Sequence, residues 1–163
     1  MHVISSADDL VDQAEAAESK WDFTKAAKLY HKAADMGNAQ AQFSLGHAYN
    51  YGQGVSLDQA KAVEWYRKAA AQDHAGAQNS LGCAYDDGKG VKQNKVKAAE
   101  WYRKSAEQGF PCAQNNLGYA YQHGDGVPKD LAKAKEWYQK AAKQGFEPAK
   151  EHLAELKEMR NEQ

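Results

Sequence analysis

The chain has few cysteines and prolines, and no long apolar run. Two cysteines among 163 residues cannot form a disulfide framework, so Cys83 and Cys112 are expected to be reduced thiols. No stretch approaches the roughly 20 apolar residues that a membrane span needs. The opening residues MHVISSADDL lack the basic and apolar regions of a signal peptide. We expect a cytoplasmic protein; a secreted or periplasmic protein that had lost its signal peptide would show the same features.

Net charge is also nearly absent. The 21 basic and 22 acidic residues give a net charge of −1 at pH 7, so the chain exerts no bulk attraction on nucleic acid or an anionic membrane. Lys92, Lys95 and Lys97 form a basic run, but no aromatic side chains alternate with them as single-strand recognition requires. We therefore expect neither nucleic acid nor a membrane as the partner.

A repeat of 36 residues organises most of the chain. Residues 39–74, 75–110 and 111–146 align without a gap and share the same residue at 17 of 36 positions. Each repeat is predicted to contain two helices, because small and apolar residues recur at helical spacing in both halves. The second helix follows a good N-cap residue at Asp58, Asn94 and Asp130. The chain is therefore a tandem array of helix pairs.

Glycines occupy two kinds of position in every repeat. Each Gly-x-Gly follows a helix rather than a strand, which favours a connector over a phosphate site. Its first glycine, at position 52, 88 or 124, is expected to be a left-handed C-cap, and its second to allow a tight reversal. Glycines also lie inside each first helix, at positions 46, 82 and 118. There we expect a close helix approach, with Trp or Tyr packing over the gap.

The segment AQNSLGCAYDDGKGVKQNKVKAAEWYRKSAEQG resembles the SEL-one-like repeat (SLR), a longer relative of the tetratricopeptide repeat. The resemblance covers residues 39–146. Residues 5–38 are similar to an ordinary tetratricopeptide helix pair, without the Gly-x-Gly insertion. Residues 147–163 begin like another repeat and then become highly charged, as expected of a capping helix that closes the core.

The resemblance implies one all-α domain spanning residues 1–163, a right-handed superhelical α-solenoid of about nine helices. It also implies binding of other proteins in a concave groove lined by the first helices. Cysteine-rich bacterial relatives carry a disulfide in each repeat, whereas this chain has residues such as Gln78 and Ala106 at those places. We therefore do not expect this chain to share the β-lactam binding to which those relatives are linked.

By analogy with the related repeats, certain positions of each first helix are expected to face the groove. The residues at these positions differ between repeats, whereas the residues at the packing positions are the same. This difference favours a surface tailored to a partner; the alternative is exposed residues that are free to vary. The candidate partner-binding residues are Phe43, His47, Asn50 and Tyr51 in the first repeat; Asn79, Cys83, Asp86 and Asp87 in the second; and Asn115, Tyr119, Gln122 and His123 in the third. The N-terminal pair would add Glu15 and Glu18.

Charge along this expected groove predicts the character of the partner. No Lys or Arg occurs in residues 39–51, 75–87 or 111–123, so the groove should be neutral to acidic, centred on Asp86 and Asp87. A neutral to basic segment would bind there, because a negative potential attracts cationic surfaces. Amide side chains would hold its backbone, and aromatic side chains such as Phe43 and Tyr119 would anchor it.

No other constellation predicts chemistry. His47 and Cys83 share a repeat position, but its third member is Tyr119 and a structural metal site needs four ligands. Asp86 and Asp87 are helix neighbours that point about 100° apart, which is poor general-acid geometry. We expect no metal, cofactor or catalytic residue, and a monomeric adaptor or scaffold. The alternative is an inhibitor or immunity protein that neutralises a toxin or enzyme by direct binding.

Overall fold

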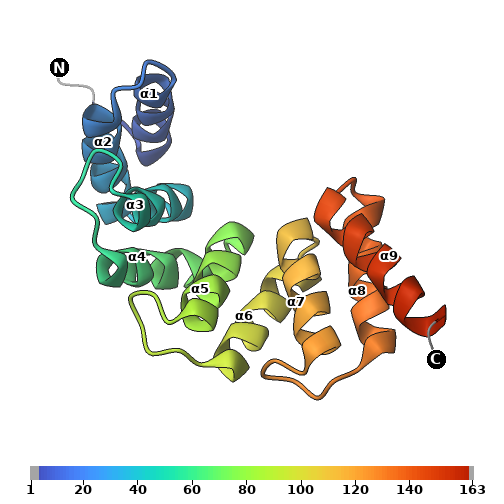
Figure 1. Cartoon of the computed structure of the whole chain (residues 1–163). Helices are drawn as coiled ribbons and strands as arrows, with labels where there is room; N and C mark the ends of the chain where they lie inside the picture. Colours follow the sequence, from blue (N-terminus) through green and yellow to red (C-terminus); the bar gives the residue numbers. More distant parts are fainter. Residues whose placement is uncertain (1–3, 162–163) are drawn as a thin grey trace. The chain divides into compact units, whose positions relative to one another are not determined.

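The computed structural model describes residues 4–161 as nine α-helices, without a strand (Figure 1). The prediction of an all-α repeat fold is confirmed. No helix among these described residues is long and apolar enough to cross a membrane. The helices are α1 (Ala7–Ser19), α2 (Phe23–Asp35), α3 (Ala39–Tyr51), α4 (Gln59–Ala71), α5 (Ala75–Asp87), α6 (Lys95–Glu107), α7 (Pro111–His123), α8 (Leu131–Lys143) and α9 (Glu147–Asn161).

The helices form two compact units. The N-terminal unit comprises Met1–Ala77 with Lys89–Lys92, and the C-terminal unit comprises Gln78–Gly88 with Gln93–Gln163. In the N-terminal unit α1 packs on α2, α2 on α3, and α3 on α4. In the C-terminal unit α6 packs on α7, α7 on α8, and α8 on α9. The second helices α2 and α8 thus each contact their own first helix and the next one.

The predicted caps and connectors are confirmed. Oδ1 of Asp58 accepts a hydrogen bond from the Lys61 backbone N–H at 3.0 Å, and Asn94 and Asp130 cap α6 and α8 in the same way. The first glycine of each Gly-x-Gly has a left-handed backbone, with φ of 66°, 68° and 72° in chain order. The backbone N–H of each N-cap residue also donates to a carbonyl near the end of the preceding helix, at 2.9 Å. These loops are therefore hydrogen-bonded connectors.

The second glycine of each Gly-x-Gly has a role that the sequence did not reveal. Its backbone lies against the start of the second helix of the preceding repeat. A Cβ atom on Gly54 would lie 2.8 Å from the Thr24 nitrogen and closer still to the Phe23 carbonyl; one on Gly126 would meet Lys95 and Val96 similarly. Only glycine allows two backbones to approach so closely. This residue therefore determines how consecutive repeats pack, in addition to reversing the chain.

The glycine inside each first helix lies under a tyrosine ring of the second helix. A Cβ on Gly82 would lie 2.6 Å from two ring carbons of Tyr102, and Tyr138 covers Gly118 in the same way. The predicted close approach is thus confirmed, with Tyr as the packing residue. The tryptophan beside each tyrosine is only half-buried: Lys68 Nζ lies 4.3 Å from the Trp65 ring centroid, a cation–π contact repeated along the chain.

Pairs of glutamines at equivalent repeat positions, one buried and one exposed, connect the helix ends. In the C-terminal unit, Gln144 Nε2 donates to Gln114 Oε1 at 3.0 Å and to the Gly109 carbonyl at 2.9 Å. Gln114 Nε2 in turn donates to the Ala106 carbonyl at 3.3 Å. The same pattern joins Gln42 and Gln72 in the N-terminal unit. Gln144 thus gives the Gly109 carbonyl a donor beyond the helix end, and Gln114 adds a second donor to the Ala106 carbonyl, which also accepts from the Gly109 N–H.

Helix α9 is the predicted capping helix, and its assignment as a cap stays a prediction. Ala149 and Leu156 are buried, whereas most of its charged side chains are exposed. The predicted capping segment extends to residue 163, and its last two residues lie outside the described range.

The contact between Gly82 and Tyr102 predicts a stability change. Gly82→Leu should lower the free energy of unfolding by about 1–3 kcal/mol or more, because the added side chain overlaps the Tyr102 ring and the Ala98 carbonyl. Chemical denaturation measures this loss. The matched control is Ala132→Leu on the exposed side of α8, which should leave the free energy within about 0.5 kcal/mol. Equal stability of the two variants would contradict the packing role of Gly82.

The buried glutamines predict a second change. Gln114→Leu keeps the approximate volume but removes one of the two donors to the Ala106 carbonyl and one acceptor of Gln144. We expect a loss of about 1–3 kcal/mol in the free energy of unfolding, from about 0.5–1.5 kcal/mol for each of the two lost hydrogen bonds. The control is Gln139→Leu, an exposed glutamine of α8. A Gln114→Leu variant as stable as this control would show that the glutamine pair contributes nothing.

Candidate partner-binding surfaces

Three predicted site positions lie in the last turn of a first helix, and at two of them the side chain accepts a hydrogen bond from the tyrosine that covers the helix glycine. Tyr102 Oη donates to Asp86 Oδ2 at 3.4 Å, and Tyr138 Oη donates to Gln122 Oε1 at 2.7 Å. Asn50 is the equivalent residue of the first repeat and is half-buried. Asp86 and Gln122 therefore contact their own repeat's second helix, and Gln122 is buried.

Asn79 and Asn115 are also buried and bonded within the C-terminal unit. Asn116 Nδ2 donates to Asn79 Oδ1 at 3.0 Å, and the ring Nδ1 of His152 lies 2.9 Å from Asn115 Oδ1. These contacts link α5 to α7 and α7 to α9. The sequence analysis assigned these amides to a partner's backbone; in the structure they connect neighbouring helices. Their assignment to a partner stays a prediction.

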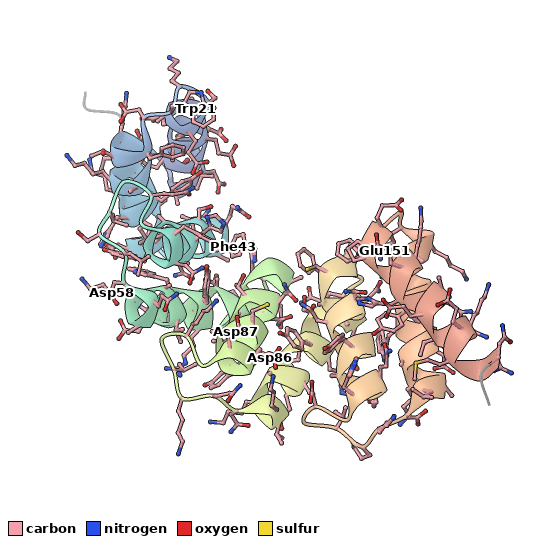
Figure 2. All side chains as sticks on the ribbon, viewed as in Figure 1. Trp21, Phe43, Asp58, Asp86, Asp87 and Glu151 are labelled. Carbon is pink, nitrogen blue, oxygen red and sulfur yellow. The ribbon has the colours of Figure 1, made fainter. Side chains whose placement is uncertain are left out.

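The two adjacent carboxylates have different surroundings (Figure 2). Asp86 Oδ1 lies 2.7 Å from Lys95 Nζ, and this ion pair raises the pKa of the lysine. Asp87 is exposed. The negative charge expected from both residues is thus partly neutralised at Asp86 by a lysine of α6, and Asp87 contributes the exposed carboxylate.

The two cysteines are free thiols in the structure. Burial raises the pKa of Cys83 and of Cys112, which disfavours the reactive thiolate. Among residues 4–161, no group of three or more His, Cys, Asp or Glu side chains is arranged to hold a metal ion.

Exposed aromatic residues remain at the other predicted positions of the C-terminal unit. The Tyr119 side chain is 44% exposed, and its ring stacks on His123 with centroids 3.9 Å apart. His123 Nδ1 also lies 3.0 Å from the Tyr119 carbonyl oxygen, so its orientation is defined. Tyr119 and His123 thus form an ordered, solvent-exposed aromatic pair at the end of α7.

In the N-terminal unit, the predicted residues Phe43 and His47 line an open hollow together with Glu18. We call it the α1–α3 hollow; its other lining residues are Phe23, Ser44 and Gln53. The remaining predicted residue, Tyr51, is exposed and lies beside His47, with ring centroids 4.5 Å apart. The sequence analysis missed Phe23 and Gln53, because neither occupies a groove position of the aligned first helices.

His74 is a further residue that the sequence analysis did not single out. Its Nδ1 accepts a hydrogen bond from the Ala77 N–H at 3.1 Å at the start of α5, and its Nε2 lies 2.9 Å from Gln40 Oε1. Its ring stacks on Phe43 with centroids 4.7 Å apart. A nitrogen that accepts from the backbone carries no proton, so this geometry requires the neutral ring with the proton on Nε2. A signal was available: His74 occupies the repeat position of the N-cap Asn38.

Comparison with known families agrees with this architecture. The Sel1 repeat family model matches residues 16–38, 39–74, 75–110 and 113–146. The chain is a Sel1 repeat protein. The match at 16–38 identifies a further Sel1 repeat in the N-terminal segment that the sequence analysis compared with an ordinary tetratricopeptide pair. No match was found among curated proteins.

Solved structures of Sel1 repeat proteins are similar to this chain. A protective antigen of uropathogenic Escherichia coli with an SLR fold is 40% identical, with a TM-score of 0.83 over 86% of this chain and 31% of that one. A Sel1 repeat protein of Oxalobacter formigenes is 32% identical, with a TM-score of 0.86 over 92% and 63%. Helicobacter pylori cysteine rich protein B is 28% identical, with a TM-score of 0.65 over 81% and 95%. The chain thus spans less than two thirds of the first two structures.

The neutral His74 cap predicts that this Sel1 repeat protein loses stability in acid. Burial lowers the pKa of His74 from its usual value near 6.5, so the unfolded chain binds this proton more readily than the folded chain. The stability contribution of the neutral ring is therefore present above about pH 6.5 and is lost as the pH falls through the lower folded pKa. Melting temperatures from pH 7.5 to pH 5 would measure this loss.

The control for this pH dependence is His74→Asn, which keeps a capping acceptor and does not titrate. The melting temperature of this variant should fall less between about pH 7.5 and pH 5 than that of the unchanged protein. Identical pH dependence in the two proteins would rule out His74 as a contributor.

Proposed function

We propose that this chain is a non-enzymatic adaptor or scaffold that binds a polypeptide partner through the exposed sides of its first helices. Sel1 repeat proteins are generally protein-interaction modules. The observation that carries the proposal is the charge distribution: α3, α5 and α7 contain no Lys or Arg. Basic side chains lie elsewhere, several of them over the tryptophans of the second helices.

Variation between repeats supports the same proposal. The glycine, tyrosine and glutamine positions that pack the helices are identical in all three 36-residue repeats. The position of His47, Cys83 and Tyr119 carries a different residue in each repeat. A scaffold that repeats while one side of it varies is suited to recognition of a specific partner.

The exposed side chains define the chemistry of that partner. Tyr119 offers a large exposed ring held by His123, the kind of residue that anchors protein interfaces. Asp87 adds an exposed carboxylate. A neutral to basic segment with an apolar side chain matches these features.

The proposal is tested by isolating the partner and measuring its binding kinetics. The tagged protein is used to capture partners from its source cell, and the captured protein is purified for surface plasmon resonance. Tyr119→Ala should speed dissociation about tenfold or more, because buried anchors act largely through the off-rate. Asp87→Lys should slow association instead, and it leaves the pair between Asp86 and Lys95 intact.

The matched control is Lys97→Glu, a charge reversal on the exposed side of α6. It should change neither rate by more than about twofold. Loss of binding in this variant, with Tyr119→Ala and Asp87→Lys silent, would refute the proposed surface. If the captured partner is an enzyme whose activity stops on binding, the protein is an inhibitor or immunity protein rather than an adaptor.

A further inference from the structure

The α1–α3 hollow combines aromatic rings with a carboxylate. Phe23, Phe43 and His47 supply the rings, and Glu18 supplies the charge. The hollow has a volume of about 430 Å³, within the range of roughly 300–1,000 Å³ that is usual for ligand sites. Trp21, which is 81% exposed, packs edge-on against Phe23, so the aromatic surface continues beyond the hollow.

The Glu18 carboxylate is held in a defined position. The buried Tyr30 donates its hydroxyl proton to Glu18 Oε2 at 3.0 Å, and the Ser44 hydroxyl also hydrogen bonds Tyr30. Burial and the charges of Glu18 and Glu15 raise the pKa of Tyr30, so this phenol remains a donor at every physiological pH. Glu18 itself is exposed. A fixed carboxylate loses little side-chain entropy when a cation binds to it.

The lining of the hollow carries a negative charge at Glu18. None of the six lining residues is Lys or Arg, and the adjoining helix α3 contains neither. Glu15 lies one turn before Glu18 on α1, close enough for its charge to act on Tyr30 as well. An anionic ligand would be repelled here, and a purely apolar one would cover the carboxylate without pairing it. A cation would pair with Glu18 and lie against the rings.

We infer that the α1–α3 hollow binds an arginine side chain presented by a protein partner. The inference rests on the proposed function, which it deepens by naming the side chain that this hollow recognises. Arginine suits the hollow better than lysine for two reasons. Its planar guanidinium stacks on aromatic rings and is less strongly hydrated than an ammonium group. Its five N–H donors can also reach several acceptors, here the Glu18 carboxylate and the side-chain oxygens of Ser44 and Gln53.

The experiment uses the full chain and short blocked peptides. The ¹⁵N-labelled protein is titrated with acetyl-Ala-Arg-Ala-amide, and with versions that carry lysine or citrulline, the neutral isostere of arginine. We expect saturable shifts of the Ser44 and His47 amide signals, with a Kd of about 1 mM or lower for the arginine peptide. The lysine peptide should bind at least about threefold more weakly, and the citrulline peptide should not saturate at about 10 mM. Equal binding of the citrulline peptide would overturn the inference.

Two variants locate the binding. Glu18→Gln keeps an acceptor for Tyr30 but removes the charge, and should weaken the arginine peptide about fivefold. His47→Ala changes an exposed ring and should weaken it by a similar factor, so the test does not depend on one variant remaining folded. The matched control is Glu64→Gln, an exposed carboxylate of α4 outside the hollow, which should leave the Kd unchanged. If neither hollow variant weakens binding, the site is wrong.

Two further outcomes separate this inference from the proposed function. Free arginine binding as tightly as the blocked peptide would identify an amino-acid site and overturn the assignment to a protein segment. A captured partner whose binding is unaffected by Glu18→Gln and His47→Ala would refute the inference and leave the proposed function standing. Arginine-peptide binding at the hollow with no protein partner of the intact chain would instead refute the proposed function.

Discussion

The structure depends on the contact between a tyrosine ring of the second helix and the glycine beneath it in the first helix of the same repeat. A Cβ atom on Gly46, Gly82 or Gly118 would overlap the ring of Tyr66, Tyr102 or Tyr138. Glycine inside a helix costs about 1 kcal/mol relative to alanine, so the buried ring must offset that cost. The contact brings the two helices of a repeat close together and leaves the tyrosine hydroxyl near the last turn of the first helix.

That hydroxyl connects the scaffold to the candidate surface. Tyr102 donates to Asp86 and Tyr138 to Gln122, and Tyr30, the tyrosine at the same position of α2, donates to Glu18 without covering a glycine. Gln122 is buried by the contact, Asp86 is also paired with Lys95, and Glu18 stays exposed with its carboxylate held toward the α1–α3 hollow. A hydrogen bond from the tyrosine at this repeat position therefore accompanies a buried side chain in one helix pair and an exposed one in another. Binding residues and scaffold residues cannot be separated by repeat position alone.

Much of the fold could be predicted because its causes are local. Asp58 caps α4 since a short acceptor side chain satisfies an N–H at a helix start wherever that helix lies. Gly52 takes a left-handed backbone because the chain must leave a helix there. The period of 36 residues then implies that each such solution recurs. The candidate site was harder to predict: Phe43, His47 and Glu18 were named, but not the hollow that joins them.

The sequence by itself determined the helices, their caps, their connectors and the absence of basic residues from the first helices, because each follows from residues close together in the chain. Only the tertiary structure decided which polar side chains are exposed. Asn79 and Asn115 are amides of the type that bind a peptide backbone, yet neighbouring helices bury them. The hollow likewise required the end of α1 and the side of α3 to meet. Burial depends on contacts between residues about 30 positions apart, which a local pattern does not contain.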